Sequence, residues 1–486
     1  MPETAGTTPT ANCLLLQAAR RAPSWSAVLM LATVAAAVTA LLFPAALAAA
    51  IDAALGRAEP DTAFVRLAGL LAAGALADVL VGLTGASYSA TTTAWLRHRL
   101  LRHTFALGVP GQHRFAAGDV LTRLTTDAPG SGQVLPVVFR AAMVMATSMG
   151  AVVAIWLIDW RVAVAFLLGL PPTIVLVRVF IVRASELFMA YRRLQAAIAA
   201  RLVDALAGIR TIRASGTAAQ EIDRILVPVP ELGATGRALW HTQRQLTWQA
   251  ALLVPLLEIL VIAVAGFGVA AGRVTPGELL AAVVYVRLAL GVFEQVESLA
   301  VVAQSRVGAA RVAEVLAEQV GLPHALTRSL PEGLGALELR SVTVRAGERV
   351  VLDQLDLEVP AGASVAIVGR SGAGKTTVAS LIGRLADPDE GEVLLDGIPV
   401  HMVATEDLRR AVAYAFEQPA ILGSSVHDAI AYGRPASSRA DVERAARAAQ
   451  AEGFIARLPA RYDTPIAEAP LSGGEAQRLG LARAIA

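Results

Sequence analysis

The chain has 486 residues, of which 55% are hydrophobic and only 17% are charged, and its formal net charge is +2. Ordinary soluble domains carry about 25% charged residues, so this composition favours a part that lies in a membrane. The small net charge points to no particular partner, and a nucleic-acid partner is not expected. Cys13 is the only cysteine, which excludes an intrachain disulfide. The length favours more than one domain.

Six apolar stretches are each long enough to cross a bilayer, which takes about 20 residues of helix. They cover residues 26–50, 64–86, 134–158, 162–182, 250–271 and 279–300. The first is too long for the hydrophobic region of a signal peptide, and five more follow it, so we interpret it as an uncleaved span. Charged residues in and beside the stretches, among them Asp78 and Arg140, favour helices that line a wet cavity or pack on one another.

The connections between these stretches predict their orientation. The connections after the first, third and fifth stretches are short, whereas those after the second and fourth are long and rich in arginine. The positive-inside rule therefore puts the N-terminus and the long connections in the cytosol. Because the long connections keep a helical composition, we expect the helices to continue beyond the bilayer and to turn near 108–118 and 214–219.

The pattern changes after the sixth stretch. Residues 318–335 contain prolines and glycines and are typical of a linker. Short β-like runs then follow at 337–344, 350–359, 364–368 and 393–395, which predicts a soluble α/β domain. The predicted organisation is a cytosolic N-terminal segment (1–24), a membrane domain (25–317), a linker (318–335) and a soluble domain (336–486).

A phosphate-binding pattern follows the predicted strand at 364–368. The motif G-x-x-x-x-G-K-T precedes a predicted helix, and its candidate residues are Gly369, Arg370, Ser371, Gly372, Ala373, Gly374, Lys375, Thr376 and Thr377. The glycines let backbone N–H groups surround a phosphate, Lys375 reaches the β- and γ-phosphates of ATP, and the Thr376 hydroxyl ligates Mg²⁺. An ordinary glycine-rich turn is the alternative. Of the 42 basic residues, however, Lys375 is the only lysine, and it lies inside this motif.

A second motif opens a predicted helix near the C-terminal end of the sequence. It consists of Leu471, Ser472, Gly473, Gly474 and Glu475. The two motifs lie about a hundred residues apart. Together with the six apolar stretches, they make the chain resemble a half-unit of an ABC transporter of the exporter type. The resemblance covers nearly all of the chain. It implies an all-α membrane domain of six helices with long cytosolic extensions, followed by an α/β P-loop NTPase domain.

The resemblance also implies partners and a mode of action. In this family the second motif closes over the ATP held by the phosphate loop of another subunit, so Ser472 and Gly474 are expected to contact the partner's ATP. The expected partners are a second half-transporter, identical or different, membrane lipid and a transported substrate of unknown class. The expected cofactors are ATP and Mg²⁺. Coupling turns that touch the ATP-binding domains are expected near 111–119 and 216–221, and the expected location is the cytoplasmic membrane, with the ATP-binding domain in the cytosol.

The sequence departs from the family pattern at three places. It ends at Ala486, before the segment that carries the Walker B strand, the catalytic glutamate and the switch histidine in the family. No catalytic residue is therefore predicted in this chain, which as written is expected to bind ATP without hydrolysing it efficiently, and we expect the sequence to come from a longer gene. Ala346 stands where an aromatic residue stacks on adenine. Glu417 stands at the Q-loop glutamine position, with Gln418 as an alternative, and Glu417 is a candidate Mg²⁺ ligand.

These departures leave two functional interpretations. The first is one half of an ATP-driven exporter of a small molecule, lipid or peptide. The second is a degenerate, weakly hydrolysing subunit of a heterodimeric exporter. A soluble ABC ATPase of the DNA-repair kind shares both motifs and is excluded by the six apolar stretches.

Two ionisable residues in the last two stretches are expected to meet inside the bundle. Glu258 and Arg287 are predicted to lie at similar depths on neighbouring helices, about 21 and 16 Å below the outer turn at ~1.5 Å per helical residue. We favour a structural ion pair over a polar contact for the transported substrate.

Overall fold

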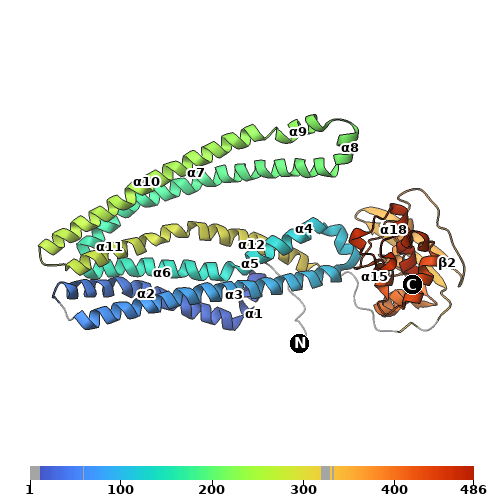
Figure 1. Ribbon diagram of the computed structural model, residues 1–486, viewed down its shortest axis with the longest axis horizontal. Coiled ribbons are helices and arrows are strands. Elements are labelled where there is room, and N and C mark those ends of the chain that lie inside the picture. The colour runs from blue at the N-terminus through green and yellow to red at the C-terminus, as the bar shows by residue number, and fades with distance from the viewer. Residues whose placement is uncertain (1–10, 58–59, 319–328, 331–332) are drawn as a thin grey trace. The chain divides into compact units, whose positions relative to one another are not determined.

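The computed structural model describes residues 11–57, 60–318, 329–330 and 333–486 (Figure 1). The chain divides into two compact units, one formed by 1–101 with 118–317 and the other by 102–117 with 318–486. One boundary between the units falls between residues 317 and 318, and residues 102–117 are grouped with the second unit. The first ten residues and most of the predicted linker lie outside the described residues.

The membrane unit is entirely helical in its described part, as predicted. Its helices are α1 (Ala11–Arg21), α2 (Pro23–Ala54), α3 (Pro60–Arg114), α4 (Ala117–Thr122), the π-helix η1 (Arg123–Asp127), α5 (Ala128–Gly132), α6 (Val134–Ile158), α7 (Trp160–Ala207), α8 (Ile209–Ala214), α9 (Ala218–Leu226), α10 (Val229–Ala270), α11 (Pro276–Leu290), the 3₁₀ turn η2 (Gly291–Gln295) and α12 (Val296–Ala317). Helix α3 continues into the second unit.

Five segments among the described residues are long and apolar enough to cross a membrane. They are Pro23–Ala54, Asp61–Val109, Ala117–Ile158, Ala218–Ala270 and Pro276–Phe293. The remaining predicted stretch, 162–182, overlaps a shorter apolar helix at Trp160–Pro172. The helices also extend well beyond the apolar stretches, as expected from the composition of the connections.

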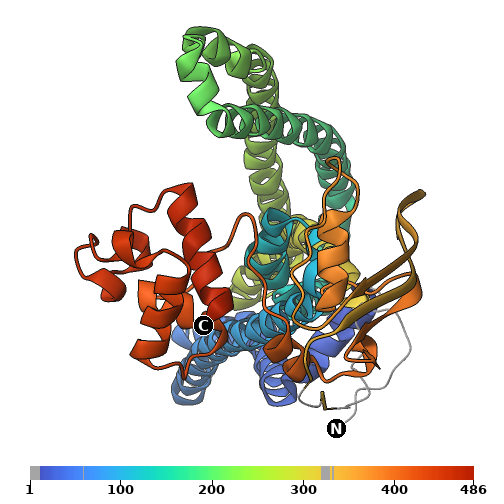
Figure 2. The ribbon, with the colours of Figure 1, turned by 90° about the vertical axis from the view of Figure 1, so that its right-hand side faces the viewer.

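The predicted turns are present where glycine permits them. Gly108 interrupts α3 with φ +60°, and Gly216 separates α8 from α9 with φ +69°. Residues with a Cβ rarely adopt such angles, so Gly108 permits the kink within α3 and Gly216 permits the turn between the short helices α8 and α9. Figures 1 and 2 show α7 and α10 as a pair of long helices, joined through α8 and α9, that diverges from the rest of the membrane unit.

Helix α11 packs against α2, α6 and α10. Val286 and Ala282 on α11 are fully buried in a cluster with Phe166 and Val261. Close packing at the start of α11 depends on Gly277, because a Cβ on this residue would lie only 2.2 Å from the carbonyl oxygen of Ala48 on α2.

Polar contacts join the C-terminal end of α2 to the N-terminal end of α11. Thr275 caps α11 and forms a capping box with Glu278. The Asp52 carboxylate accepts hydrogen bonds from the Thr275 hydroxyl (2.5 Å) and from the Gly277 N–H (3.0 Å). The cap satisfies N–H groups that would otherwise lack partners at the helix start.

The second unit contains a four-stranded antiparallel sheet in the order β2-β1-β3-β4. The strands are β1 (Leu337–Ala346), β2 (Arg349–Val359), β3 (Glu390–Leu395) and β4 (Ile398–Pro399). The helices α13 (Lys375–Ile382) and α14 (Thr405–Ala411) contribute to the core of this sheet through Val378, Leu381 and Leu408.

A second core in this unit is helical. It is formed by α15 (Val426–Ile430), α16 (Arg439–Ala448), α17 (Glu452–Ile455) and α18 (Gly473–Ile485), with the 3₁₀ turns η4 (Ala431–Gly433), η5 (Arg461–Asp463) and η6 (Ile466–Glu468) between them and η3 (Val400–Met402) before α14. Val442, Ile455 and Leu479 are almost completely buried in it.

The prediction of a paired strand at 364–368 is wrong for this structure. The segment pairs with none of the strands in the described residues, and Val365, Ile367 and Val368 are 52, 45 and 88% exposed. A strand is stabilised by a hydrogen-bonded neighbour, and the antiparallel strands of this sheet take one another as neighbours. Residues 364–368 therefore have the apolar composition of a buried strand, but they have no hydrogen-bonded neighbour in the described residues and stay exposed.

The packing of α11 on α2 gives a first testable prediction. Gly277→Ala is expected to destabilise the protein by about 1–3 kcal/mol, because its Cβ must displace the backbone of Ala48. The measurement is the melting temperature of the purified full chain in detergent. Gly266→Ala on α10 is the matched control, because nothing lies within 4 Å of the added Cβ. Equal melting temperatures of the two variants would contradict the close approach.

Candidate nucleotide-binding site

The phosphate loop, residues 369–376, is held against strand β2. Gly372 and Gly374 have φ of +81° and +85°, and Gly374 is the N-cap of α13. A Cβ on Gly374 would lie 2.7 Å from Leu352 Cδ2 and 3.3 Å from the carbonyl oxygen of Val351. Glycine is therefore required at position 374 both by the backbone angle and by the strand beside it.

The Lys375 side chain folds back onto the start of the phosphate loop. Its Nζ donates hydrogen bonds to the carbonyl oxygens of Gly369 and Arg370, both at 2.9 Å. The ammonium group thereby draws the two ends of the loop together and stays beside the N-terminus of α13. Thr376 and Thr377 follow in the first turn of this helix, and Thr376 is exposed.

The other end of α13 is fixed by side chains that the sequence analysis did not identify. The Tyr414 hydroxyl accepts a hydrogen bond from Gly383 N–H (2.8 Å) and donates one to the Ala379 carbonyl (2.9 Å). Arg409 donates to the carbonyls of Gly383 and Arg384. Burial raises the pKa of Tyr414, which keeps its hydroxyl protonated as a donor. The helix that carries Lys375 is therefore held at both ends.

The second motif forms the start of α18. Ser472 is its N-cap: the hydroxyl accepts from Glu475 N–H (3.3 Å), and the Glu475 carboxylate accepts from Ser472 N–H (2.8 Å). These hydrogen bonds from the Ser472 backbone and hydroxyl hold the pKa of Glu475 below its usual value. A Cβ on Gly473 or Gly474 would meet no atom within 4 Å, so the surface around these two glycines is open in this chain.

The segment that contains Glu417 is attached to this same helix through its backbone. Gln477 donates to the carbonyl of Glu417 (3.0 Å), and Arg483 donates to the carbonyl of Ala420 (2.8 Å). A Cβ on Gly480 would lie 2.7 Å from Cβ of Pro419, which shows how closely the segment approaches α18. The sequence analysis did not predict this contact, because it depends on residues about 60 positions apart.

The predicted metal ligands, Thr376 and Glu417, are not brought together by any contact in the described residues. The side chains of Glu417 and Gln418 are both exposed, so the structure does not decide which of them takes the glutamine role. Among the described residues, no group of three or more His, Cys, Asp or Glu side chains is arranged to hold a metal ion by itself. The metal assignment stays a prediction, and the donor set fits an ion that ATP phosphates help to hold.

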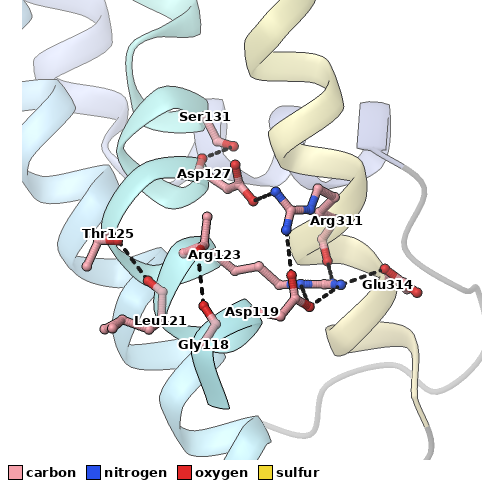
Figure 3. A network of polar contacts seen from close by, with 10 residues as sticks. Gly118, Asp119, Leu121, Arg123, Thr125, Asp127, Ser131, Arg311 and Glu314 are labelled. Carbon is pink, nitrogen blue, oxygen red and sulfur yellow. Dashed lines mark hydrogen bonds and ion pairs between the residues drawn. The ribbon is translucent and has the colours of Figure 1, made fainter. Parts of the chain in front are cut away.

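A polar network in the membrane unit joins α4 and η1 to α12 (Figure 3). The Arg123 side chain is only 6% exposed and contacts Asp119 (2.7 Å), Glu314 (2.9 Å) and the backbone carbonyl of Arg311. Arg311 in turn contacts Asp119 (2.5 Å) and Asp127 (3.1 Å). The buried arginine is thus compensated from two helices, which fixes the end of the predicted coupling region 111–119 to the last helix of the unit.

The π-helix η1 has a local role in this network. It spans Arg123–Asp127, so it displaces the following residues from ordinary helical register within the network itself. Gly308 on α12 lets Asp127 approach, because a Cβ there would lie 3.3 Å from Asp127 Cα. The Asp119–Arg123 spacing of four residues is a local signal for part of this network in the sequence.

Glu258 and Arg287 pair as predicted, with an oxygen-to-nitrogen distance of 3.0 Å. The Glu258 side chain is 17% exposed and that of Arg287 is 74% exposed. The pairing is confirmed, but the exposure of Arg287 does not agree with the prediction that both side chains lie inside the bundle. The choice between a structural pair and a contact for substrate stays a prediction.

Comparison with known proteins identifies the class. The family described as the ABC transporter transmembrane region matches residues 26–293, and the family described as ABC transporter matches residues 352–486. The chain therefore belongs to the ABC transporters, with a membrane region fused to an ATP-binding domain. Its relatives are half-transporters of the exporter kind.

Two curated relatives and one solved structure illustrate the likeness. The ABC transporter ATP-binding protein RamA of Streptomyces coelicolor is 41% identical over 459 residues, covering 94% of this chain and 72% of RamA. The ATP-dependent lipid A-core flippase of Chromobacterium violaceum is 29% identical over 413 residues, covering 81% of this chain and 70% of the flippase. A bacterial Atm1-family ABC exporter with ATP bound superposes with a TM-score of 0.73 at 25% identity, covering 96% of this chain and 84% of that one.

The polar network of Figure 3 gives a second testable prediction. Arg123→Met is expected to destabilise the membrane unit by about 2 kcal/mol, because it removes the contacts of a buried arginine with Asp119 and Glu314, while Asp119 keeps its contact with Arg311. The measurement combines the melting temperature with hydrogen exchange over residues 117–132. Arg306→Met on α12 is the control, because Arg306 is exposed. Faster exchange in both variants, or in neither, would contradict the network's role.

Proposed function

We propose that this chain is one half of a dimeric exporter that uses ATP to move a small molecule, lipid or peptide across the cytoplasmic membrane. The supporting observation is the closed phosphate loop, in which Lys375 bridges the carbonyls of Gly369 and Arg370 at the N-terminus of α13. A helix N-terminus and a lysine on the same loop form an environment suited to a polyphosphate. The proposed orientation, with the ATP-binding domain in the cytosol, rests on the arginine-rich connections.

The proposed roles follow from this geometry. Residues 369–377 surround the phosphates through their N–H groups, Lys375 exchanges its loop carbonyls for β- and γ-phosphate oxygens, and the exposed Thr376 hydroxyl ligates Mg²⁺. In the proposed dimer, residues 471–475 cover the partner's ATP. The open surface around Gly473 and Gly474 supports this role, because the partner's nucleotide can approach the backbone there.

The substrate class is proposed only broadly. The flippase relative acts on lipid A-core according to its name, which makes an amphipathic lipid a useful first candidate to test. The ion pair between Glu258 and Arg287 is proposed as structural, because one side chain compensates the other.

Loss of ATP binding on mutation of Lys375 is the third prediction. Lys375→Ala is expected to weaken ATP binding by about 10- to 100-fold, because charge-assisted hydrogen bonds to the phosphates are lost. Lys375→Arg is expected to fail as well, because the planar guanidinium is too wide for the closed loop. The measurement is calorimetric titration of ATP into the full chain in lipid nanodiscs.

Arg444→Ala, on the exposed face of α16, is the control for a general effect of removing charge. Wild-type chain that binds no ATP would refute the proposed function itself. Full affinity in Lys375→Ala would refute the role of the lysine.

The degenerate-subunit alternative is favoured by one observation. The backbone of Glu417 is fixed to α18, yet its carboxylate is exposed and adds a negative charge where the family has a neutral glutamine. A subunit of this kind would bind ATP and support transport while a different partner supplies the more active site.

The charge at position 417 gives the fourth prediction. Glu417→Gln is expected to strengthen Mg²⁺-ATP binding by about threefold, because it removes repulsion between the carboxylate and the γ-phosphate. The measurement is ATP titration with and without Mg²⁺, with Gln418→Ala as the neighbouring control. A loss of Mg²⁺-dependent affinity in Glu417→Gln would instead identify the carboxylate as a metal ligand.

A further inference from the structure

The hairpin of β1 and β2 forms one wall beside the phosphate loop. Leu352 and the Val351 carbonyl are the atoms that a Cβ on Gly374 would meet, so β2 runs directly against the loop. Further toward the hairpin turn, a guanidinium nitrogen of Arg349 lies 3.9 Å from the position that a Cβ on Gly372 would occupy. The Arg349 side chain therefore reaches from the sheet to the phosphate loop.

This hairpin lacks an aromatic side chain that could stack on the adenine of ATP. No residue from 341 to 351 is aromatic, and Ala346 occupies the position at which the sequence analysis expected an aromatic residue. Ala346 and Arg349 are direct partners across the antiparallel ladder. Side chains at such positions lie on the same face of the sheet, about 5 Å apart, so Arg349 lies beside the space that the small Ala346 leaves.

Arg349 also differs from the neighbouring arginines in its partners. Arg345 is paired with Glu390 at 2.7 Å, and Arg340 is paired with Glu338 at 2.6 Å. In the described part of the chain, Arg349 is exposed and makes no ion pair. Its guanidinium is therefore available for a ligand that enters next to the phosphate loop.

We propose that Arg349 stacks its guanidinium plane on the adenine of bound ATP and so takes the place of the missing aromatic side chain. The inference rests on the proposed ATP binding. A guanidinium is planar, weakly hydrated and stacks on flat rings, which a lysine cannot do. Lys375 and the N–H groups of the loop already provide for the phosphates, whereas the hairpin offers the base no aromatic side chain, and Arg340 and Arg345 are held in ion pairs.

The test compares ATP with inorganic triphosphate, which has the phosphates and lacks the base. Arg349→Ala is expected to weaken ATP binding about tenfold, the size typical of one stacking contact, and to leave the affinity for triphosphate unchanged. Arg349→Lys keeps the charge and is expected to behave like Arg349→Ala. The measurement is calorimetric titration of each ligand into the full chain in nanodiscs.

Two further variants sharpen the test. Arg345→Ala removes an arginine from the same hairpin on the opposite face, because neighbouring residues of a strand point to opposite sides, and it is expected to leave ATP binding unchanged. Arg349→Ala combined with Ala346→Tyr is expected to recover ATP affinity by restoring a flat ring on the same face.

The outcomes separate this inference from the proposed function. Equal losses for ATP and triphosphate in Arg349→Ala would overturn stacking in favour of a phosphate contact. Unchanged ATP affinity in Arg349→Ala, with wild-type chain binding ATP, would overturn this inference alone. Wild-type chain that binds neither ligand would overturn the proposed function.

Discussion

The passage of the phosphate loop against strand β2 is the constraint on which the nucleotide site depends. A Cβ on Gly374 would collide with Leu352 and crowd the Val351 carbonyl, and the positive φ of this glycine precedes the first residue of α13. Lys375 follows directly and bridges the carbonyls of Gly369 and Arg370. Tyr414 and Arg409 form hydrogen bonds at the far end of the helix, so α13 is held at both ends. The proposed stacking by Arg349 involves the hairpin of β1 and β2, which lies against the same loop.

The second motif depends on a different set of contacts. Its helix α18 belongs to the helical core and is joined to the Glu417 segment through backbone carbonyls. This attachment uses Gln477, Arg483 and the close approach of Gly480 to Pro419, and it leaves the Glu417 side chain free. Helix α18 is therefore joined by hydrogen bonds to the segment 417–420. The identity of residue 417 can vary without breaking this link.

In the membrane unit, small residues and compensated charges act together with the cluster of large buried side chains around Phe166 and Val286. Gly277 brings α11 against the backbone of α2, and Asp52 satisfies the start of α11. The network around Arg123 fixes α4 and η1 to α12. Helices in a membrane gain little from the hydrophobic effect between them, so close approach and satisfied polar groups decide their positions.

The sequence by itself determined the class of protein, the order of its parts and the phosphate loop. Three local properties of short segments were sufficient. They are the length of the apolar stretches, the positions of the arginines in the connections, and the spacing of the glycines around Lys375. The pairing of Glu258 with Arg287 was also predictable, because helical rise fixes depth along neighbouring spans.

Only the tertiary structure decided which distant residues support these local signals. The strand predicted at 364–368 has the right composition, but a strand exists only where a neighbour accepts its hydrogen bonds. The contacts of Tyr414, Gln477 and Arg349 join residues that are far apart in the chain or across a hairpin. The pattern of apolar and polar residues cannot predict such contacts, because they depend on which surfaces meet after the helices and strands have formed.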